Sequence, residues 1–392
     1  MIESLELFCG AGGLALGLGQ AGFGHKALIE WDSDSCRNIN SNIENGYGAV
    51  QGWHVIQSDV RAVGFSEQFS DVRVISGGPP CQPFSLGGKH QAYNDKRDMF
   101  PEAVRAVREI KPQAFIFENV KGLLRQSFSA YYEYIILQLK HPEKVKNEGM
   151  SWQEHAEQLK AYDAAGDFPD LYYKVKYHLF NAADYGVPQD RHRVVIVGFR
   201  SDLDVDYQFP APTHSREALL YSKWVTGEYW ERHNLPMPET VPDKDRAAVK
   251  KLGMVPPTLK PWATVRDALK GLPEPKEGEE TTIPNHEFRG GARMYPGHSG
   301  SVLDEPSKTI KAGGHGVPGG ENMLVLDDGT LRYYTVRESA RIQTFPDDYR
   351  FYGSWTESMR QIGNAVPVRL AKIIGDSVYK QLERVDNHGE EK

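Results

Sequence analysis

The residue best suited to covalent chemistry in this chain of 392 residues is a cysteine in a proline-rich stretch. Cys81 is preceded by Gly-Gly-Pro-Pro and followed by Gln-Pro-Phe-Ser, directly after a β-branched run at residues 72–76. A strand that enters two glycines and two prolines must end and turn, because proline fixes φ and has no N–H. We therefore expect a thiol on a stiff loop at the carboxyl end of a strand, where open α/β sheets bind ligands. The alternative is a buried structural cysteine, but a cysteine flanked by prolines is a poor core residue.

A carboxylate and two arginines lie where further strands are predicted to end or begin. The apolar run 114–117 predicts a buried strand that ends in Glu118. Burial beside a nucleophile would favour the protonated form of this carboxyl, whereas the alternative is a carboxylate facing a helix N-terminus. Arg191 and Arg193 stand two residues apart before a predicted strand at 194–199, so we expect them to share one face of it. A guanidinium in the pocket could hold a carbonyl oxygen, and a surface strand of salt bridges is the alternative.

A glycine-rich turn near the N-terminus predicts a site for a nucleotide-type cofactor. Residues 4–9 read as a strand, and Gly10, Gly12 and Ala15 then fit the pattern G-x-G-x-x-G/A at the start of a helix. Without side chains at the turn, a cofactor can lie on the backbone and on the helix N-terminus. The alternative is a glycine-rich turn that binds no ligand.

Residues at the ends of the next two predicted strands could hold an adenosine. A strand at 26–29 ends in Glu30, which could accept both ribose hydroxyls, and Trp31 could stack on the adenine. Asp59 follows a strand near 54–56 and could accept from the adenine amino group. The alternatives are a half-buried core aromatic for Trp31 and a helix N-cap for Asp59. These features suit NAD as well as S-adenosylmethionine.

The elements that must position these residues alternate between strands and helices. Helical spacing of apolar residues is found at 99–110, 131–139, 152–164 and 368–384, and residues 385–392 read as a frayed polar tail. This alternation predicts an α/β fold. From about residue 201 proline becomes frequent and periodicity fades, so the sequence predicts a second, loop-rich domain there.

Composition is that of an ordinary globular protein, with 40% hydrophobic and 25% charged residues. The sequence has no apolar run of about 18 residues and no signal-peptide pattern at its start, so we expect a cytoplasmic protein that does not cross a membrane. Cys9, Cys36 and Cys81 have no paired spacing, so neither a disulfide framework nor a zinc site is expected. The net charge of −7 is unusual for a nucleic-acid-binding protein, although a local basic cleft is sufficient.

Five stretches, in family order, resemble motifs of the DNA cytosine-5 methyltransferases. They are Phe-Cys-Gly-Ala-Gly-Gly (8–13), the cysteine loop (77–85), Phe-Glu-Asn-Val (117–120), Gln-Asp-Arg-His-Arg (189–193) and Gly-Asn-Ala-Val-Pro (363–367). The resemblance implies a Rossmann-like S-adenosylmethionine-dependent methyltransferase sheet with helices on both faces, plus a smaller loop-rich target-recognition domain. It implies that residues 1–200 and 356–392 form the catalytic domain and that residues 201–355 form the recognition domain, with a hinge at its C-terminal end.

The resemblance also favours S-adenosylmethionine over NAD, with S-adenosylhomocysteine as the product and no metal. It assigns cofactor contacts to Phe8, Gly10, Gly12, Gly13, Glu30, Trp31, Asp59, Val60, Pro80 and Asn364. The contact of Pro80 would be made by its backbone, and Asn364 would come from the far end of the chain.

For catalysis, the resemblance implies that the Cys81 thiolate adds to C6 of a cytosine flipped out of double-stranded DNA, so that C5 can take the methyl group. Glu118 would hold or protonate N3, Arg193 would contact O2, and Arg191 would help to set the site. DNA contacts are implied for Ser85, Lys89, Arg97 and Thr309, and base-edge contacts are open to His286, Arg289 and Arg293. The alternatives are a solvated loop after the cysteine and a plain glycine-rich hairpin around Thr309.

The implied role is the modification enzyme of a restriction–modification system, active as a monomer, with a cognate restriction endonuclease acting on the same site as its partner. A tRNA methyltransferase is the nearest rival, but the RNA-acting branch carries a Cys-Phe-Thr signature and this chain has no cysteine after Cys81. Two further alternatives leave part of the sequence unexplained. The cysteine loop would have no role in an NAD-dependent oxidoreductase, and Cys81, Glu118 and Arg193 would have none in an inactive DNA-binding module.

Overall fold

A computed structural model describes the chain except for residues 81–97, 254, 280, 296–298, 314–321 and 391–392. The chain divides into two compact units. Unit 1 comprises Met1–Phe180, His192–Phe209 and Ala371–Lys392, and unit 2 comprises Asn181–Arg191 and Pro210–Leu370. The chain therefore passes between the units four times, at 180/181, 191/192, 209/210 and 370/371.

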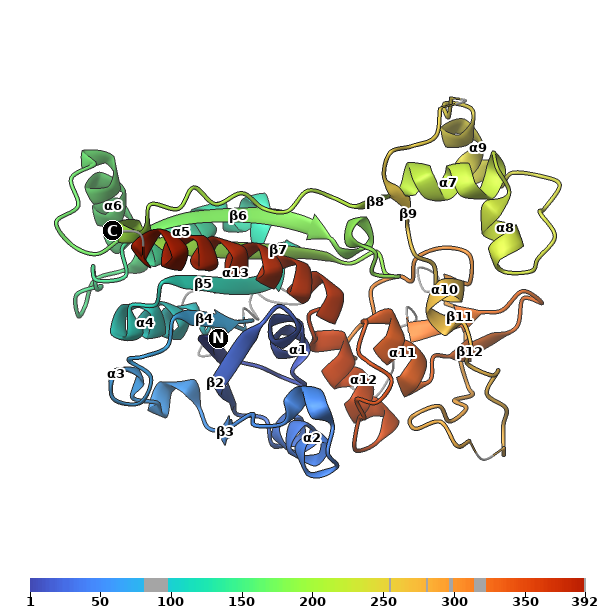
Figure 1. Ribbon diagram of the computed structural model, residues 1–392, viewed down its shortest axis with the longest axis horizontal. Helices are drawn as coiled ribbons and strands as arrows, with labels where there is room; N and C mark the ends of the chain where they lie inside the picture. The colour runs from blue at the N-terminus through green and yellow to red at the C-terminus, as the bar shows by residue number, and fades with distance from the viewer. Residues whose placement is uncertain (81–97, 254, 280, 296–298, 314–321, 391–392) are drawn as a thin grey trace. The chain divides into compact units, whose positions relative to one another are not determined.

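Unit 1 is built on a seven-stranded sheet in the order β3-β2-β1-β4-β5-β7-β6 (Figure 1). The strands are β1 Ile2–Leu7, β2 Phe23–Glu30, β3 Val55–Gln57, β4 Val74–Gly77, β5 Ala114–Val120, β6 Tyr173–Asn181 and β7 His192–Arg200. The pairs that join β3, β2, β1, β4 and β5 are parallel, and β7 is antiparallel to β5. This mainly parallel sheet confirms the predicted fold class.

Helices cover both faces of the sheet, so its central strands are buried on both sides (Figure 1). They are α1 Gly13–Gln20, α2 Ser33–Glu44, α3 Phe65–Gln68, α4 Phe100–Ile110, α5 Ser129–Lys140, α6 Trp152–Ala165 and α13 Val368–Glu390. The continuous apolar runs that predicted β4 and β5 follow from this burial. Within the described part of the chain, no helix combines the length and the apolarity needed to cross a membrane.

Two of the differences between the predicted and the observed element boundaries have a clear local cause. β1 ends at Leu7 because Phe8 adopts a left-handed conformation, with a φ of 58°, which a strand cannot accommodate. The last helix does not fray at residue 385 but continues to Glu390. An ion pair of 2.7 Å between Asp386 and Arg73 holds this part of α13 on unit 1.

A buried polar cluster fixes the start of α1 on the sheet. The Ala15 N–H donates to the Glu6 carboxyl at 3.2 Å, and the Ala15 carbonyl accepts from Nε2 of His25 at 2.8 Å. Nδ1 of His25 lies 2.9 Å from the Ser4 hydroxyl, so Ser4 donates to the neutral ring. Burial raises the pKa of Glu6 to about 8 and lowers the pKa of His25 to about 4, so both side chains are neutral near pH 7.

Unit 2 contains more helix than its proline content suggests. Its elements are β8 His214–Ser215, α7 Arg216–Trp224, α8 Glu228–Arg232, α9 Asp243–Val249, β9 Lys260–Pro261, α10 Val265–Leu269, β10 Ser301–Val302, β11 Met323–Val325, β12 Leu331–Tyr333, α11 Val336–Ile342 and α12 Trp355–Asn364. Leu219, Tyr229 and Trp230 form an apolar cluster of their own between α7 and α8.

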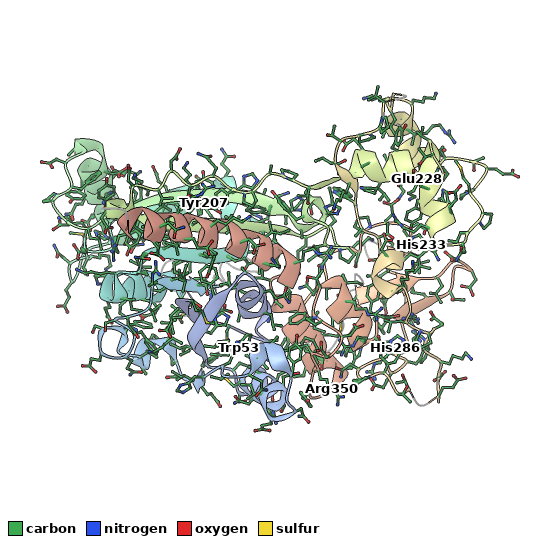
Figure 2. All side chains as sticks on the ribbon, viewed as in Figure 1. Trp53, Tyr207, Glu228, His233, His286 and Arg350 are labelled. Carbon is green, nitrogen blue, oxygen red and sulfur yellow. The ribbon has the colours of Figure 1, made fainter. Side chains whose placement is uncertain are left out.

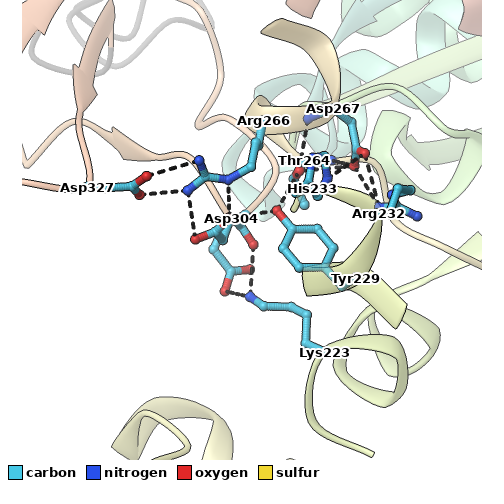
Figure 3. A network of polar contacts seen from close by, with 10 residues as sticks. Lys223, Tyr229, Arg232, His233, Thr264, Arg266, Asp267, Asp304 and Asp327 are labelled. Carbon is cyan, nitrogen blue, oxygen red and sulfur yellow. Dashed lines mark hydrogen bonds and ion pairs between the residues drawn. The ribbon is translucent and has the colours of Figure 1, made fainter. Parts of the chain in front are cut away.

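A polar network connects these helices to the segment that follows β10 (Figure 3). The Asp304 carboxylate accepts from Nε of Arg266 at 2.6 Å and from the hydroxyl of Tyr229 at 2.7 Å. The buried Lys223 ammonium donates to the Asp304 carbonyl at 2.9 Å, and Arg266 also binds Asp327. Charge-assisted hydrogen bonds of this kind are the stronger ones, so the chain just before Thr309 is firmly held.

Candidate active site

The candidate site lies at the carboxyl edge of the sheet in unit 1, where the strand order reverses. β1 and β4 are neighbours in the sheet, but β2 and β3 follow on one side and β5 on the other. Ligands of open α/β sheets bind at such a switch point. The loops that leave β1 and β4 begin at Phe8 and Gly78, and β5 ends beside them with Glu118.

The loop after β1 leaves open space over its backbone. Phe8, Gly10 and Gly12 all have positive φ, and the Gly12 N–H closes the turn on the Cys9 carbonyl at 2.9 Å. A Cβ added to Gly10 would meet no atom within 4 Å, whereas one added to Gly12 would lie 3.2 Å from the ring of Trp53 (Figure 2). Gly10 therefore has room in front of it for a ligand, while Gly12 is needed for packing; Gly13 begins α1 directly after it.

Glu30 is fixed at the end of β2 by the backbone around it. Its carboxylate is 9% exposed and accepts N–H groups from Gly10 at 2.8 Å and from Trp31 and Asp32 at 2.9 Å each. A carboxylate has about four acceptor positions, so about one remains for a hydroxyl donor. The geometry fits one ribose hydroxyl at Glu30 next to the open face of Gly10, which is the fit expected of an adenosine-containing cofactor.

The other two predicted adenine contacts differ in their surroundings. The side chain of Trp31 is 72% exposed, so it is not a half-buried core aromatic and its ring is free to stack on a ligand. Asp59 caps the short helix that begins at Val60, accepting from the Arg61 N–H at 3.0 Å. The Arg61 guanidinium also binds this carboxylate and lowers the pKa of Asp59. The predicted alternative, an N-cap, is thus present at Asp59.

The cysteine itself lies outside the described residues, as do Ser85, Lys89 and Arg97. Hydrogen bonds fix the residues that flank this stretch. The Pro79 carbonyl accepts from Nδ2 of Asn119 at 2.9 Å, and the exposed Pro80 offers its carbonyl to the Met99 N–H at 3.1 Å. Asn119, at the end of β5, therefore binds the backbone where the chain enters the cysteine loop. The bond between Met99 and Pro80 joins the residues on the two sides of the loop.

Glu118 and Arg193 form a buried ion pair beside that loop. Nε of Arg193 lies 2.5 Å from Oε1 of Glu118, and each side chain is 11% exposed. Burial lowers the pKa of Arg193, and the negative charge of Glu118 opposes that shift. A Cβ on Gly78 would lie 3.3 Å from Oε2 of Glu118, so glycine at this position leaves the second carboxylate oxygen its space.

Arg191 requires a correction, because it does not share a strand face with Arg193. β7 begins at His192, and Arg191 belongs to unit 2. Its fully buried guanidinium donates to the carbonyls of Ile310 at 3.0 Å, Gly363 at 2.7 Å and Ala365 at 2.9 Å. Residues two apart share a face only where both belong to a strand. The spacing of Arg191 and Arg193 therefore led to a wrong prediction, since only Arg193 lies in β7.

Two further predicted contacts lie in unit 2. Thr309 is half-buried, and its hydroxyl donates to the Asp190 carbonyl at 2.8 Å. Asn364 is the last residue of α12 and is exposed, although the residues on both sides of it are buried. The Thr309 hydroxyl is thus held by a hydrogen bond, whereas the Asn364 side chain is exposed at the end of a helix.

His286 cannot be a base-reading residue in this structure. Its side chain is 1% exposed, with Nδ1 3.0 Å from the Thr335 hydroxyl and Nε2 2.7 Å from the Pro273 carbonyl (Figure 2). Arg289 and Arg293 are exposed, and the Arg289 guanidinium lies 5.4 Å from the centre of the Trp355 ring. Only these two of the three candidates remain open to a ligand.

The residues that sequence reasoning missed are those that position others. Asn119 lies inside the motif at 117–120, and Gln189 lies inside the motif at 189–193, but neither was given a role. Gln343 is fully buried and bonds Gln189 at 2.7 Å. A polar residue next to a proposed catalytic residue is the only signal that the sequence offers for such a role.

The sheet order and the glycine turn on Glu30 are typical of α/β proteins that bind a nucleotide-type cofactor at the first switch point of the sheet. A sequence model of the C-5 cytosine-specific DNA methylases matches residues 2–142 and 149–380. The chain therefore belongs to the C-5 cytosine-specific DNA methylase family, whose members are methyltransferases, and the resemblance noted in its motifs is confirmed.

Individual relatives agree with this assignment over nearly the whole chain. Type II methyltransferase M.Eco47II of Escherichia coli is 33% identical over 387 residues, which cover 97% of this chain and 80% of that protein. Type II methyltransferase M.PspPI of Psychrobacter sp. (strain TA137) is 32% identical over 389 residues, covering 96% of this chain and 79% of that protein. The crystal structure of the S. pombe Dnmt2 methyltransferase matches with a TM-score of 0.54 at 16% identity, covering 98% of this chain and 99% of that one, and it supports the fold.

Proposed function

We propose that this chain transfers the methyl group of S-adenosylmethionine to C5 of a cytosine flipped out of double-stranded DNA. The observation that carries the proposal is the buried pair of Glu118 and Arg193 at the sheet edge where Pro79 and Pro80 lead to Cys81. The pair presents a carboxyl oxygen next to a guanidinium N–H. Cytosine carries N3 next to O2, so the two side chains are complementary to that edge of the base.

In the proposed mechanism the Cys81 thiolate forms a bond to C6, and the displaced electron pair makes C5 nucleophilic. When the base binds, Glu118 takes up a proton that it shares with N3, and Arg193 stabilises negative charge at O2; together they make C6 electrophilic. S-adenosylmethionine supplies an electrophilic methyl group, which C5 takes, leaving S-adenosylhomocysteine. Loss of the C5 proton to solvent then returns the electron pair that expels Cys81. The cofactor contacts proposed for this chain are those assigned by resemblance, with Glu30 and the open face of Gly10 as their best-supported members.

Base flipping is part of the proposal because C6 of a stacked cytosine cannot be reached by a thiol. Extruding a base from a duplex costs a few kcal/mol, so the DNA must be held firmly. We assign DNA contacts to Thr309 and to Ser85, Lys89 and Arg97. Residues 201–355 would read the target and residues 1–200 with 356–392 would carry out the chemistry.

The names of the relatives suggest the biological role. Those relatives are Type II methyltransferases, so we infer that this chain is the modification enzyme of a Type II restriction–modification system in the cytoplasm. It would act as a monomer, and an endonuclease that cuts the same site would be its partner.

Bisulfite sequencing tests the reaction and the target together. The chain is expressed in a host that has no other cytosine methylation, and the host DNA is then sequenced. We expect 5-methylcytosine at one short recurring sequence. Unmodified DNA from cells that contain soluble protein able to bind S-adenosylmethionine would contradict the proposal, and tRNA from the same cells would then be examined.

Replacement of the nucleophile tests the covalent step. Cys81→Ser and Cys81→Ala should abolish methyl transfer in the same assay, because neither side chain provides a thiolate. Both variants should still bind S-adenosylhomocysteine, which serves as the control for folding. Full methylation by either variant would rule out the covalent adduct.

A further inference from the structure

Three fully buried polar side chains connect distant segments of unit 2. Gln189, Arg191 and Gln343 each have 0% exposure, and they come from the motif at 189–193 and from the end of α11. Their partners lie in the segment around Ile310 and at the C-terminal end of α12. Buried polar groups must be satisfied, so these contacts hold the segments in one arrangement.

The two glutamines form a chain of hydrogen bonds that runs in one direction. The Ile310 N–H donates to Oε1 of Gln189 at 2.9 Å, and Nε2 of Gln189 donates to Oε1 of Gln343 at 2.7 Å. Nε2 of Gln343 then donates to the carbonyls of Ile362 at 2.7 Å and Ala365 at 2.9 Å. Bonds aligned in this way polarise one another, so the loss of any one weakens the others.

Arg191 makes a second connection between the same two segments, since its guanidinium donates to the carbonyls of Ile310, Gly363 and Ala365. The backbones also pack directly against each other. A Cβ on Gly363 would lie 2.3 Å from the Ala312 nitrogen, a distance at which no side chain fits. The segment around Ile310 and the end of α12 therefore behave as one rigid piece.

Each connected segment carries a residue with a proposed ligand. Ile310 follows Thr309, to which we assign a DNA contact, and Ala365 follows the exposed Asn364, to which we assign a cofactor contact. A shift of either segment would be passed to the other through the glutamines. Two sites that share one rigid element influence each other's affinity, and the influence is reciprocal.

We propose that Gln189 and Gln343 are positioning residues that couple DNA binding at Thr309 to cofactor binding at Asn364. This inference rests on the proposed function, because it uses the ligands assigned there. It adds that one internal hydrogen-bond chain determines the affinity for both substrates.

The first test replaces each glutamine by methionine, which has a similar volume and no amide. The variants are Gln189→Met, Gln343→Met and the double substitution, and the matched control is Gln361→Met. Gln361 is also buried in unit 2, at 2% exposure, but its amide bonds Glu357 on its own helix. KM and kcat are measured with tritium-labelled S-adenosylmethionine and unmethylated plasmid DNA.

Both single variants should raise the KM for S-adenosylmethionine and the KM for DNA together, by at least about fivefold, with a much smaller change in kcat. The KM values of the double variant should not exceed those of the more impaired single variant. The effects of two substitutions in one chain of hydrogen bonds are not additive, because either substitution already interrupts the chain. The control should keep both KM values. A rise in only one KM, a multiplicative effect in the double variant, or a loss of thermal stability with normal KM values would overturn the proposal.

A second test uses the unaltered chain and so does not depend on how the variants fold. Saturation with S-adenosylhomocysteine, without DNA, should slow hydrogen exchange of the Ile310 amide, which is the donor to Gln189. An unchanged exchange rate in a chain that binds S-adenosylhomocysteine would overturn the coupling alone. A chain that binds no S-adenosylhomocysteine would overturn the proposed function and the coupling with it.

Discussion

Glu118 and Arg193 meet because of the register between two strands. In the antiparallel pair of β5 and β7, Glu118 lies opposite Val195 and Val120 lies opposite Arg193. Glu118 and Arg193 are therefore diagonal neighbours on one face of the sheet, within reach of each other. Removing one member of a buried ion pair costs about 3–5 kcal/mol, since the other charge is left unpaired. The proposed catalytic pair is thus also part of the structure.

Glu118→Gln should lower the rate of methyl transfer by roughly 10²- to 10⁴-fold, because an amide cannot supply the proton at N3. The rate is measured as tritium transferred to DNA. Affinity for S-adenosylhomocysteine, determined by calorimetry, should not change, as Glu118 has no assigned cofactor contact. An undiminished rate would contradict the role proposed for Glu118 as the proton donor.

Glu6 makes the stability of the chain depend on pH. Burial raises the pKa of Glu6 from 4.5 to about 8, so between these values the unfolded chain releases a proton that the folded chain keeps. Stability from this residue is therefore present below about pH 4.5 and is lost progressively as the pH rises to about 8. Each unit of difference in pKa corresponds to about 1.4 kcal/mol.

Glu6→Gln should accordingly raise the melting temperature at pH 8 by roughly 5 °C and change it little at pH 5. The amide oxygen can still accept from the Ala15 N–H, and the amide nitrogen can donate to the Ser76 hydroxyl. Glu44→Gln, at the exposed end of α2, is the control and should have no such pH dependence. Equal effects of Glu6→Gln at both pH values would show that Glu6 is not buried in its protonated form.

For single residues, the sequence predicts the position of a candidate side chain along a strand well. It predicts the contacts of that side chain less well. Glu118 and Glu30 were found because apolar runs mark the strands that end in them. The partners of Arg191 and the burial of His286 depend on residues far away in the chain. Spacing along one segment contains no information about those partners.

At the scale of elements, strands and long helices were predictable because burial shapes their sequences. β4 and β5 are continuous apolar runs, and α4 repeats apolar residues at helical spacing. The helices α7, α8 and α9 have nine, five and seven residues, which is too short for a clear period among frequent prolines. They are stabilised by tertiary contacts such as the cluster around Trp230, and these are not visible in a local pattern.

Gly363→Ala should destabilise the chain by about 1–3 kcal/mol, although alanine is the better helix former by about 1 kcal/mol. The added Cβ would lie 2.3 Å from the Ala312 nitrogen and would force α12 away from it. Gly19→Ala in α1 is the matched control, since its Cβ would meet only Nε2 of His25, at an ordinary 3.6 Å. Urea unfolding measures both. A Gly363→Ala chain as stable as the control would show that α12 does not pack tightly on this segment.

At the scale of the whole molecule, the C-terminal helix belongs to the core of the N-terminal unit. The Tyr379 ring packs edge-on against Phe23 with 5.2 Å between centroids, and the Ser377 hydroxyl lies 2.7 Å from that of Tyr207. Unit 1 is therefore complete only when both ends of the chain are present. The predicted return of the last helix to the large domain had no support in local sequence and came from resemblance.

A chain that ends at residue 209 should not fold, because it lacks α13. A chain in which a flexible Gly/Ser linker replaces residues 210–367 should fold cooperatively, since it restores all of unit 1. It should bind S-adenosylhomocysteine more weakly than the full chain, as the cofactor contact proposed for Asn364 is missing. Circular dichroism and thermal melting compare the two. A stable fold for the chain ending at 209 would show that α13 is dispensable.

The exposure of Trp31 has a practical consequence for work in solution. It is the only tryptophan among the strongly exposed hydrophobic residues of the described chain, at 72%, and the other six are more shielded. Indole fluorescence is quenched and shifts to shorter wavelength when the ring leaves water and stacks on another ring. Emission from unlabelled protein should therefore report occupancy of the proposed adenine site, since the other tryptophans are shielded from solvent.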